Sequence, residues 1–278
     1  MLRNGLGHTL DKESATAKRF VDLFSGSGAV AAHVATRRAI PVLAYDLQNF
    51  SAVLARAIIA RCKKLDADAI WKEWQKRATQ IASRYKVPVA DRFTQAYVNQ
   101  CRQWCGSKKS LPITKAYGGH YFSPEQAVWI DALRKTLPGR GPGRTAALAA
   151  LIQAASKCAA SPGHTAQPFQ PTRSAKRFLK EAWSHDVREK VKSSLKDISS
   201  TYAQTAGKAS VGDANKAVKG LKKGDLVFID PPYSGVHYSR FYHVLETVAR
   251  GKCGPVSGVG RYPKASERPR SRYSVKSE

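Results

Sequence analysis

The sequence predicts an α/β fold in which a parallel, Rossmann-like sheet is interrupted by a long, mostly helical insert. Three observations predict it. A strand, a glycine-rich turn, a helix and a second strand occupy residues 19–46. Helical patterns dominate residues 51–204, and a further strand lies at residues 226–229. Because a strand–helix–strand crossover is right-handed, its two strands are expected to be parallel neighbours in one sheet.

The first strand is expected over residues 19–24, and it leads through Ser25-Gly26-Ser27-Gly28 into a helix at residues 29–35. A second strand, residues 41–45, ends on Asp46, which lies 20 positions after Gly26. Glycines in such a turn let the backbone approach a ligand, and an acid at the next strand end accepts ribose hydroxyls. We therefore predict a site for an adenosine cofactor, although a tight turn that packs helix on strand would use the same residues. The third glycine of the dinucleotide pattern is missing, which disfavours a dinucleotide.

Apolar residues recur at helical spacing through residues 51–204. The stretch from Ser123 to Gln126 resembles a capping box with proline at the first helical position, so it predicts a helix start. An apolar helix is expected from Ala146 to Ala160, and a single basic helix from Arg173 to Ser199. This basic helix is either a DNA contact or a solvated face, and the overall charge favours DNA.

The last predicted strand, residues 226–229, follows a short helix at residues 214–221 and runs directly into Asp230-Pro231-Pro232-Tyr233. Two consecutive prolines donate no backbone hydrogen bonds and fix their backbone angles, so the neighbouring carbonyls remain free as acceptors. An acid, free carbonyls and an aromatic ring can together hold a flat group that bears an amine. The simpler interpretation is an ordinary strand stop. Since both motifs follow strands, we expect Gly26 and Asp230 to lie at the same carboxyl edge.

Composition points to a polyanionic partner. The formal net charge is +27 and the sequence pI is about 10.1, which predicts nucleic acid binding. The sequence has no apolar stretch of the ~18 residues that a membrane span needs, and its N-terminus does not resemble a secretory signal. A cytoplasmic protein is therefore expected. The five cysteines are scattered, which predicts reduced structural thiols and no metal site.

Taken together, "DLFSGSGA" and "DPPY" resemble the adenine-N6-specific DNA methyltransferases that use S-adenosylmethionine, the Dam-like enzymes of the D12 class. The resemblance implies that the first motif binds the cofactor and that the second binds the target base. The implied cofactor-binding residues are Asp22, Phe24, Ser25, Gly26, Ser27, Gly28, Asp46 as the ribose acid and Asp213 near the adenine ring. The implied catalytic residues are Asp230, Pro231, Pro232 and Tyr233. In this interpretation Asp230 and the Pro231 carbonyl accept the hydrogens of the target amine, and Tyr233 stacks on a base taken out of the duplex.

The resemblance also divides the chain. It implies a class I methyltransferase sheet built from residues 1–50 and 205–250, which would bind S-adenosylmethionine. Residues 51–204 would be the target-recognition region, with double-stranded DNA and a cognate restriction enzyme as partners. Residues 251–278, rich in Gly, Pro, Ser and Arg, are expected to be disordered or truncated.

Two departures from the family pattern leave alternatives open. Only 45 residues follow Tyr233, whereas the family continues with further strands, so we expect an incomplete sheet in a truncated gene product or one half of a split enzyme. The glycine–lysine motif before the first strand is also missing, and residues 4–8 are expected in its place. The alternatives are an RNA guanine-N2 methyltransferase and an inactive DNA-binding remnant. The 202 positions between Gly28 and Asp230 favour the DNA enzyme, because the RNA enzymes place the two motifs closer together.

Overall fold

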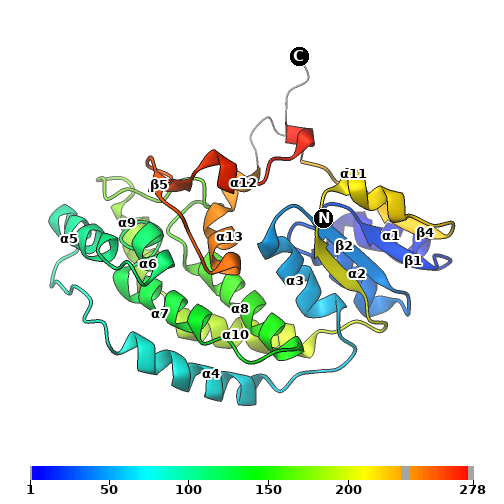
Figure 1. The fold of residues 1–278 in the computed structure, drawn as a ribbon, viewed down its shortest axis with the longest axis horizontal. Helices are drawn as coiled ribbons and strands as arrows, with labels where there is room; N and C mark the ends of the chain where they lie inside the picture. Colours follow the sequence, from blue (N-terminus) through cyan, green and yellow to red (C-terminus); the bar gives the residue numbers. More distant parts are fainter. Residues whose placement is uncertain (1, 233–237, 275–278) are drawn as a thin grey trace.

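The computed structural model describes residues 2–232 and 238–274 (Figure 1). Its centre is a parallel sheet with strand order β3-β2-β1-β4. The strands are β1 (Arg19–Asp22), β2 (Val42–Asp46), β3 (Lys208–Val211) and β4 (Asp225–Phe228). Arg19 pairs with Asp225 across β1 and β4, and its guanidinium also binds the Asp225 carboxylate at 2.6 and 2.9 Å. The predicted parallel α/β sheet is therefore confirmed.

Helices cover both faces of this sheet. Alternate residues of β1 point to opposite faces, since side chains in a strand alternate. Phe20 packs with α2 (Ala29–Arg37) and α3 (Asn49–Ile59), whereas Val21 packs with α11 (Ala214–Ala217). The remaining elements of this part are the π-helical turn η1 (Leu2–Leu6), α1 (Gly7–Glu13) and the 3₁₀ turn η2 (Val218–Gly220).

A helical insert with its own core lies beside the sheet, at the left of Figure 1. Its largest buried side chains include Trp74, Tyr117 and Tyr121. The predicted capping box at Ser123 is confirmed, with both reciprocal hydrogen bonds to Gln126 formed. The insert helices are α4 (Ala67–Ala82), α5 (Gln95–Gly106), α6 (Pro112–Tyr117), α7 (Pro124–Lys135), α8 (Pro142–Cys158), α9 (Lys176–Ser184) and α10 (Val187–Ser200).

The basic stretch from Arg173 to Ser199 is not one helix, which corrects the sequence prediction. α9 ends at Ser184 and α10 begins at Val187. Asp186 breaks the helix because its side chain accepts a hydrogen bond from the Arg188 backbone N–H and so caps the start of α10.

Two helices connect the insert to the sheet. α3 has residues in both cores: Ile59 packs with the sheet, and Phe50 packs with the insert. α13 (His243–Arg250) follows α12 (Tyr238–Phe241), and its buried Glu246 accepts hydrogen bonds from Asn49 Nδ2 at 2.6 Å and Phe50 N at 3.1 Å. This carboxylate fixes the start of α3 against α13. A domain boundary at residue 50 would fall inside α3, which contributes to both cores. The expected division of the chain at this residue therefore stays a prediction.

Residues 251–274 are folded, whereas the composition predicted a disordered or truncated tail. They form the hairpin β5 (Val256–Ser257) and β6 (Tyr262–Pro263) and the 3₁₀ turns η3 (Ala265–Glu267) and η4 (Arg272–Ser274). The Tyr262 ring lies 4.9 Å from the His243 ring, and Tyr121 OH donates to the Gly260 carbonyl at 2.9 Å. These contacts with α13 and with the insert order the segment. No helix among the described residues is long and apolar enough to cross a membrane.

Candidate functional site

The carboxyl ends of the four parallel strands meet at one edge of the sheet, and a cavity of about 240 Å³ lies there. Gly26 follows β1, and Asp230 follows β4, and both line this cavity. The expectation that they share one edge is therefore confirmed. The parallel pairing of β1 with β4 explains this, because Asp22 lies opposite Phe228 and the two following turns begin at the same level.

The glycine turn between β1 and α2 is close-packed. Gly26 and Gly28 have φ angles of 49° and 76°, in the left-handed region that glycine adopts at little cost. A Cβ atom at Gly28 would lie 2.9 Å from the Ala55 Cα atom of α3. Gly28 therefore serves helix packing, while the Gly26 backbone borders the cavity.

Asp46 at the end of β2 is held by backbone donors. Its Oδ2 accepts from Gly26 N at 2.9 Å, and its Oδ1 accepts from Gln48 N at 2.9 Å. Burial raises the pKa of this carboxyl, Glu246 adds to that rise, and the hydrogen bonds oppose it. Each carboxylate oxygen can accept about two hydrogen bonds, so Asp46 keeps acceptor capacity toward the cavity for hydroxyl groups.

Asp22 at the end of β1 is a buried acid behind the cavity. It is 1% exposed, its Oδ1 accepts from Phe24 N at 3.3 Å, and its Oδ2 is buried without a hydrogen-bond partner among the described residues. Burial raises the pKa of Asp22 to about 7, and the charges of Asp46 and Asp230 add to the rise. This edge of the sheet therefore favours a cation, which would relieve the crowding of negative charge.

Asp213 follows β3, which pairs with β2 on the side away from β1, and it also lines the cavity. Its Oδ1 accepts from both the backbone N and the side-chain Nδ2 of Asn215, each at 2.9 Å. These hydrogen bonds, together with the positive charge of Arg272, hold the pKa of the Asp213 carboxyl below its ordinary value. Asp213 is therefore an ionised acceptor at the cavity wall.

Residues 269–273 cover one side of the cavity, although no sequence pattern predicts that they lie there. The Tyr273 ring meets the Phe24 ring edge-on, with centroids 5.2 Å apart, and Tyr273 OH donates to Asn215 Oδ1 at 3.0 Å. Asn215 therefore links Tyr273 to Asp213. These residues were missed because an Arg- and Ser-rich stretch has no periodic signal, and the contact joins segments about 250 residues apart in the chain.

The proline motif that follows β4 borders the same cavity. Asp230, Pro231 and Pro232 line it, together with Tyr238 and Ser239 of α12. Tyr233, the last residue of the motif, lies outside the described residues. Tyr242, just before α13, packs on Phe50, with ring centroids 5.4 Å apart.

The structure thus brings most of the predicted site residues together. Those that line the cavity are Phe24, Gly26, Asp46, Asp213, Asp230, Pro231 and Pro232. Asp22, Ser25, Ser27 and Gly28 do not line it, and neither do Gly5 to His8, which were expected to replace the missing glycine–lysine motif. Ser25 is buried beneath the turn and Ser27 faces solvent.

The donors and acceptors of this cavity fit S-adenosylmethionine. Its ribose hydroxyls match the remaining acceptor capacity of Asp46. Its positive charge matches an edge that carries Asp22, Asp213 and Asp230. The free volume of about 240 Å³ is just below the ~300–1,000 Å³ of typical small-molecule sites, and residues 269–273 cover one side of the cavity.

Comparison with known families gives one match that covers most of the chain. Residues 4–259 match the model of the D12 class N6 adenine-specific DNA methyltransferase. Residues 269–273, which border the cavity, lie beyond the matched region.

Several curated proteins are similar to this chain. It is 24% identical to Modification methylase LlaI of Lactococcus lactis subsp. lactis, over 90% of this chain and 37% of that protein. It is 27% identical to Type II methyltransferase M.NlaIII of Neisseria lactamica, over 100% of this chain and 72% of that protein. The match to Type II methyltransferase M.FokI of Planomicrobium okeanokoites is 27% identical, over 83% of this chain and 32% of that protein. The chain thus spans about a third of the length of two of these relatives, and no solved structure matches it.

Proposed function

The chain belongs to the D12 class N6 adenine-specific DNA methyltransferase family, and we propose that it transfers a methyl group from S-adenosylmethionine to the N6 amine of adenine in double-stranded DNA. One observation carries this proposal. The glycine turn, the acid of β2 and the proline motif of β4 border a single cavity, although they lie up to about 200 residues apart in the sequence. A cofactor and a target amine could therefore meet there.

The cofactor would be bound by groups at the ends of three strands. The Gly26 backbone lets it approach the turn, Asp46 accepts the ribose hydroxyls, and Asp213 faces the adenine ring. When bound, S-adenosylmethionine supplies an electrophilic methyl group on a positively charged sulfur. The negative charge at this edge of the sheet stabilises that cation.

The target amine would be activated at the proline motif. The N6 nitrogen of adenine is a poor nucleophile because its lone pair is delocalised into the ring. Asp230 and the Pro231 carbonyl would accept hydrogen bonds from its two N–H groups, which frees the lone pair and stabilises the positive charge that develops on nitrogen. The two prolines hold these acceptors rigidly, so little reorganisation is needed during the reaction. Tyr233 keeps its predicted role as a stacking face for the extruded base.

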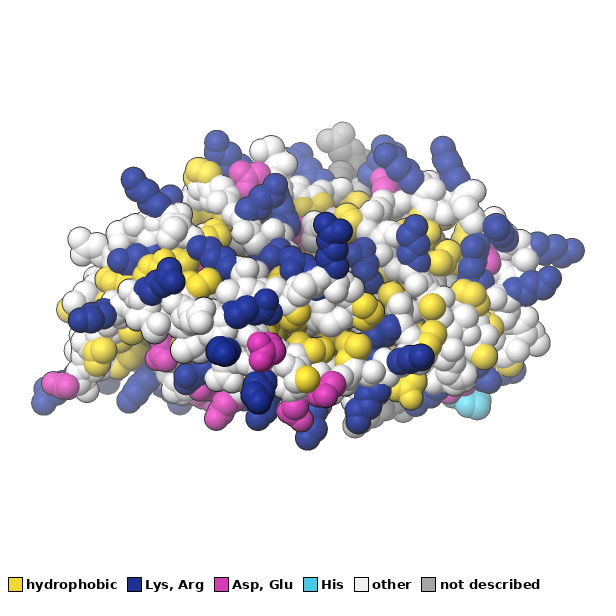
Figure 2. Space-filling model, turned by 60° about the horizontal axis from the view of Figure 1, so that its bottom comes forward, with side chains coloured by type: hydrophobic (Ala, Val, Ile, Leu, Met, Phe, Trp, Pro, Cys, Tyr) yellow, Lys and Arg dark blue, Asp and Glu magenta, His cyan; other side chains and the backbone are white. Residues whose placement is uncertain are grey.

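The DNA would be held by the basic surface. Figure 2 shows Lys and Arg side chains spread over the whole of one face of the molecule, with fewer Asp and Glu among them. The chain carries 47 Lys and Arg against 20 Asp and Glu. Contacts with phosphates are not specific for sequence, so the insert, residues 51–204, is proposed to supply the base recognition.

Two further parts of the proposal rest on the relatives and on the substrate. Because several relatives bear the names of modification or type II methyltransferases, we expect a cognate restriction enzyme as a genetic partner. With DNA as its substrate, the chain is also proposed to act in the cytoplasm. DNA from the source cells should resist cleavage at the methylated sequence, and ready cleavage by such an enzyme would contradict the partnership.

Methylation of a DNA library with isotopically labelled S-adenosylmethionine tests the proposed function. Label should appear on adenine N6 within one short sequence, which mapping of the modified bases identifies. RNA of the same sequences is the control substrate. Label on guanine in RNA, or none in either nucleic acid, would contradict the proposal.

A further inference from the structure

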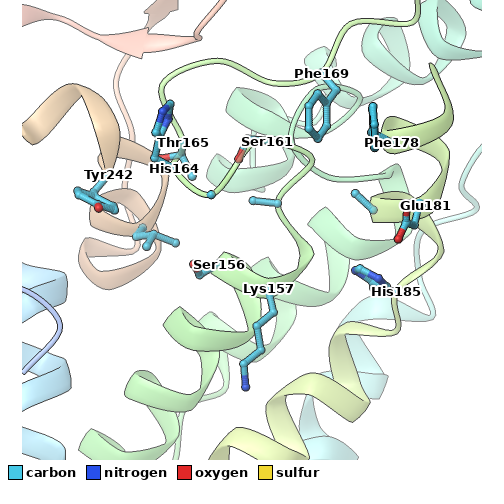
Figure 3. Close-up of a pocket in the computed structure, with 14 residues that line it drawn as sticks. Ser156, Lys157, Ser161, His164, Thr165, Phe169, Phe178, Glu181, His185 and Tyr242 are labelled. Carbon is cyan, nitrogen blue, oxygen red and sulfur yellow. The ribbon is translucent and has the colours of Figure 1, made fainter. Parts of the chain in front are cut away.

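A second cavity, of about 280 Å³, lies in the insert and has no part in the site described above. It is formed by the end of α8, the loop at residues 159–169, α9 and α13 (Figure 3). Its lining includes the aromatic residues Phe169, Phe178 and Tyr242 and the polar residues Ser161, His164, Glu181 and His185. The lining is thus suited to a flat ligand with polar edges.

One end of this second cavity is an exposed aromatic stack. The Phe169 and Phe178 rings lie side by side in Figure 3, with centroids 5.3 Å apart and planes 29° apart. Phe178 is 39% exposed although it is apolar, and the Arg177 guanidinium lies 4.5 Å from its ring. Because Phe169 stacks on this ring and the Arg177 guanidinium lies over it, a base can stack on Phe178 only where it displaces the exposed Arg177 side chain.

The cavity lining carries charges of both signs. Lys157 lines it and donates from Nζ to Ser194 Oγ at 3.0 Å, whereas the Glu181 carboxylate would repel a phosphate and can accept hydrogen bonds from the amino group of a base. The Nδ1 atom of His185 is buried and has no hydrogen-bond partner among the described residues. Lys176, Arg177 and Lys180 are exposed on the same helix, where phosphates could bind outside the cavity.

The second cavity lies next to the catalytic segment. Tyr238 and Ser239 line the first cavity, and Tyr242 and Leu245 line the second. Thr165, on the rim, donates from both its N–H and its Oγ1 to the Phe241 carbonyl, each at 2.7 Å. Residues 238–245 therefore contribute to the walls of both cavities. A duplex bound at the first cavity would pass close to the second.

We propose that the second cavity binds a nucleobase of the DNA substrate other than the target adenine, stacked on Phe178 and contacted by Glu181. The inference rests on the proposed function, because it assumes that DNA lies over residues 238–245. The base would contribute both affinity and sequence preference, since stacking tolerates any base whereas the carboxylate favours one with an amino group.

The test compares Phe178→Ala with Tyr202→Ala in the full-length chain. Tyr202 is a matched control, because it is 42% exposed and does not line this cavity. Binding is measured to a duplex that carries the methylated sequence, and to duplexes in which each base in turn is replaced by an abasic residue. Phe178→Ala should weaken binding to the intact duplex by roughly 5- to 100-fold, the loss expected for one stacked base.

At one abasic position the effect of Phe178→Ala should disappear, since the base that it contacts is already absent. Glu181→Gln should change the preferred base at that same position. The slope of affinity against salt should stay as in the parent, because stacking releases no counterions. A reduced salt slope for Phe178→Ala would instead indicate a phosphate contact and overturn the inference.

The inference and the proposed function fail in different ways. If the chain methylates adenine and Phe178→Ala binds every duplex as Tyr202→Ala does, only the inference is overturned. If the chain binds duplex DNA but methylates none, the function is contradicted, and the same comparison is made on the tightest duplex selected from a random library. A chain that binds no DNA overturns both.

Discussion

Asp22→Asn should stabilise the protein, and should do so more strongly as the pH rises. The folded protein holds this buried carboxyl with a pKa of about 7, against an ordinary value of 3.8, mainly because of burial. As the pH rises from about 4 to 7, the unfolded chain releases the proton while the folded chain keeps it, so stability is lost over this window. The complete pKa shift corresponds to a loss of roughly 4 kcal/mol in the free energy of unfolding, at 1.36 kcal/mol per pKa unit. Asparagine has nearly the same shape, cannot ionise and retains an oxygen for the Phe24 N–H.

Urea denaturation at pH 5 and pH 8.5 measures this effect without cofactor or DNA. Between pH 5 and pH 8.5, the loss of unfolding free energy that Asp22 causes in the parent grows by roughly 2–3 kcal/mol. The stability advantage of Asp22→Asn over the parent should grow by the same amount. Asp91→Asn is the control, because the Asp91 side chain is exposed. If the difference between Asp22→Asn and the parent were the same at both pH values, the reasoning about burial and crowded acids would be refuted.

Four further outcomes are expected. Gly28→Ala should destabilise the protein by about 1–3 kcal/mol, because the new methyl group meets Ala55 at 2.9 Å; an unchanged urea midpoint would contradict this close packing. Calorimetry should show the affinity for S-adenosylmethionine rising up to about pH 7, since a bound cation favours ionised Asp22. S-adenosylhomocysteine, which lacks the positive sulfur, should show a smaller rise, and equal rises would argue against the electrostatic account. Tyr273→Ala should speed cofactor association in stopped flow, because the ring that packs on Phe24 no longer covers one side of the cavity; an unchanged rate would mean that the segment is not a barrier. DNA affinity should fall steeply with salt, and a flat dependence would exclude phosphate contacts.

The sequence predicted those parts of the fold that local patterns encode. The strand, glycine turn, helix and second strand at residues 19–46 have strong apolar runs and a turn whose glycines adopt positive φ angles. β3 was not located, because in Lys208–Val211 only Ala209 is buried, so the strand has no apolar run of its own. Pairing with β2 makes it a strand, and pairing is not visible in a local pattern.

The candidate site was predicted where motifs carry it and missed where tertiary contacts carry it. Asp46 and Asp230 follow strands and could be assigned to one edge from topology alone. Residues 269–273 are polar and lack periodicity, and only their contacts with Phe24 and Asn215 bring them to the cavity. The position of Asp22 behind the cavity also depends on packing, since the motif shows only that it ends β1.

The central claim is that Asp230 activates the target amine at a cavity that binds the cofactor. The most direct test is the single-turnover rate of methyl transfer to duplex DNA by Asp230→Ala, with cofactor affinity measured by calorimetry on the same samples. The rate should fall on the order of 100- to 1,000-fold, while the affinity for S-adenosylmethionine stays close to that of the parent. Asp230→Asn keeps one acceptor oxygen, so its rate should lie between the rates of the parent and of Asp230→Ala. Transfer by Asp230→Ala at the parent rate would mean that this acid only ends a strand, and would contradict the account.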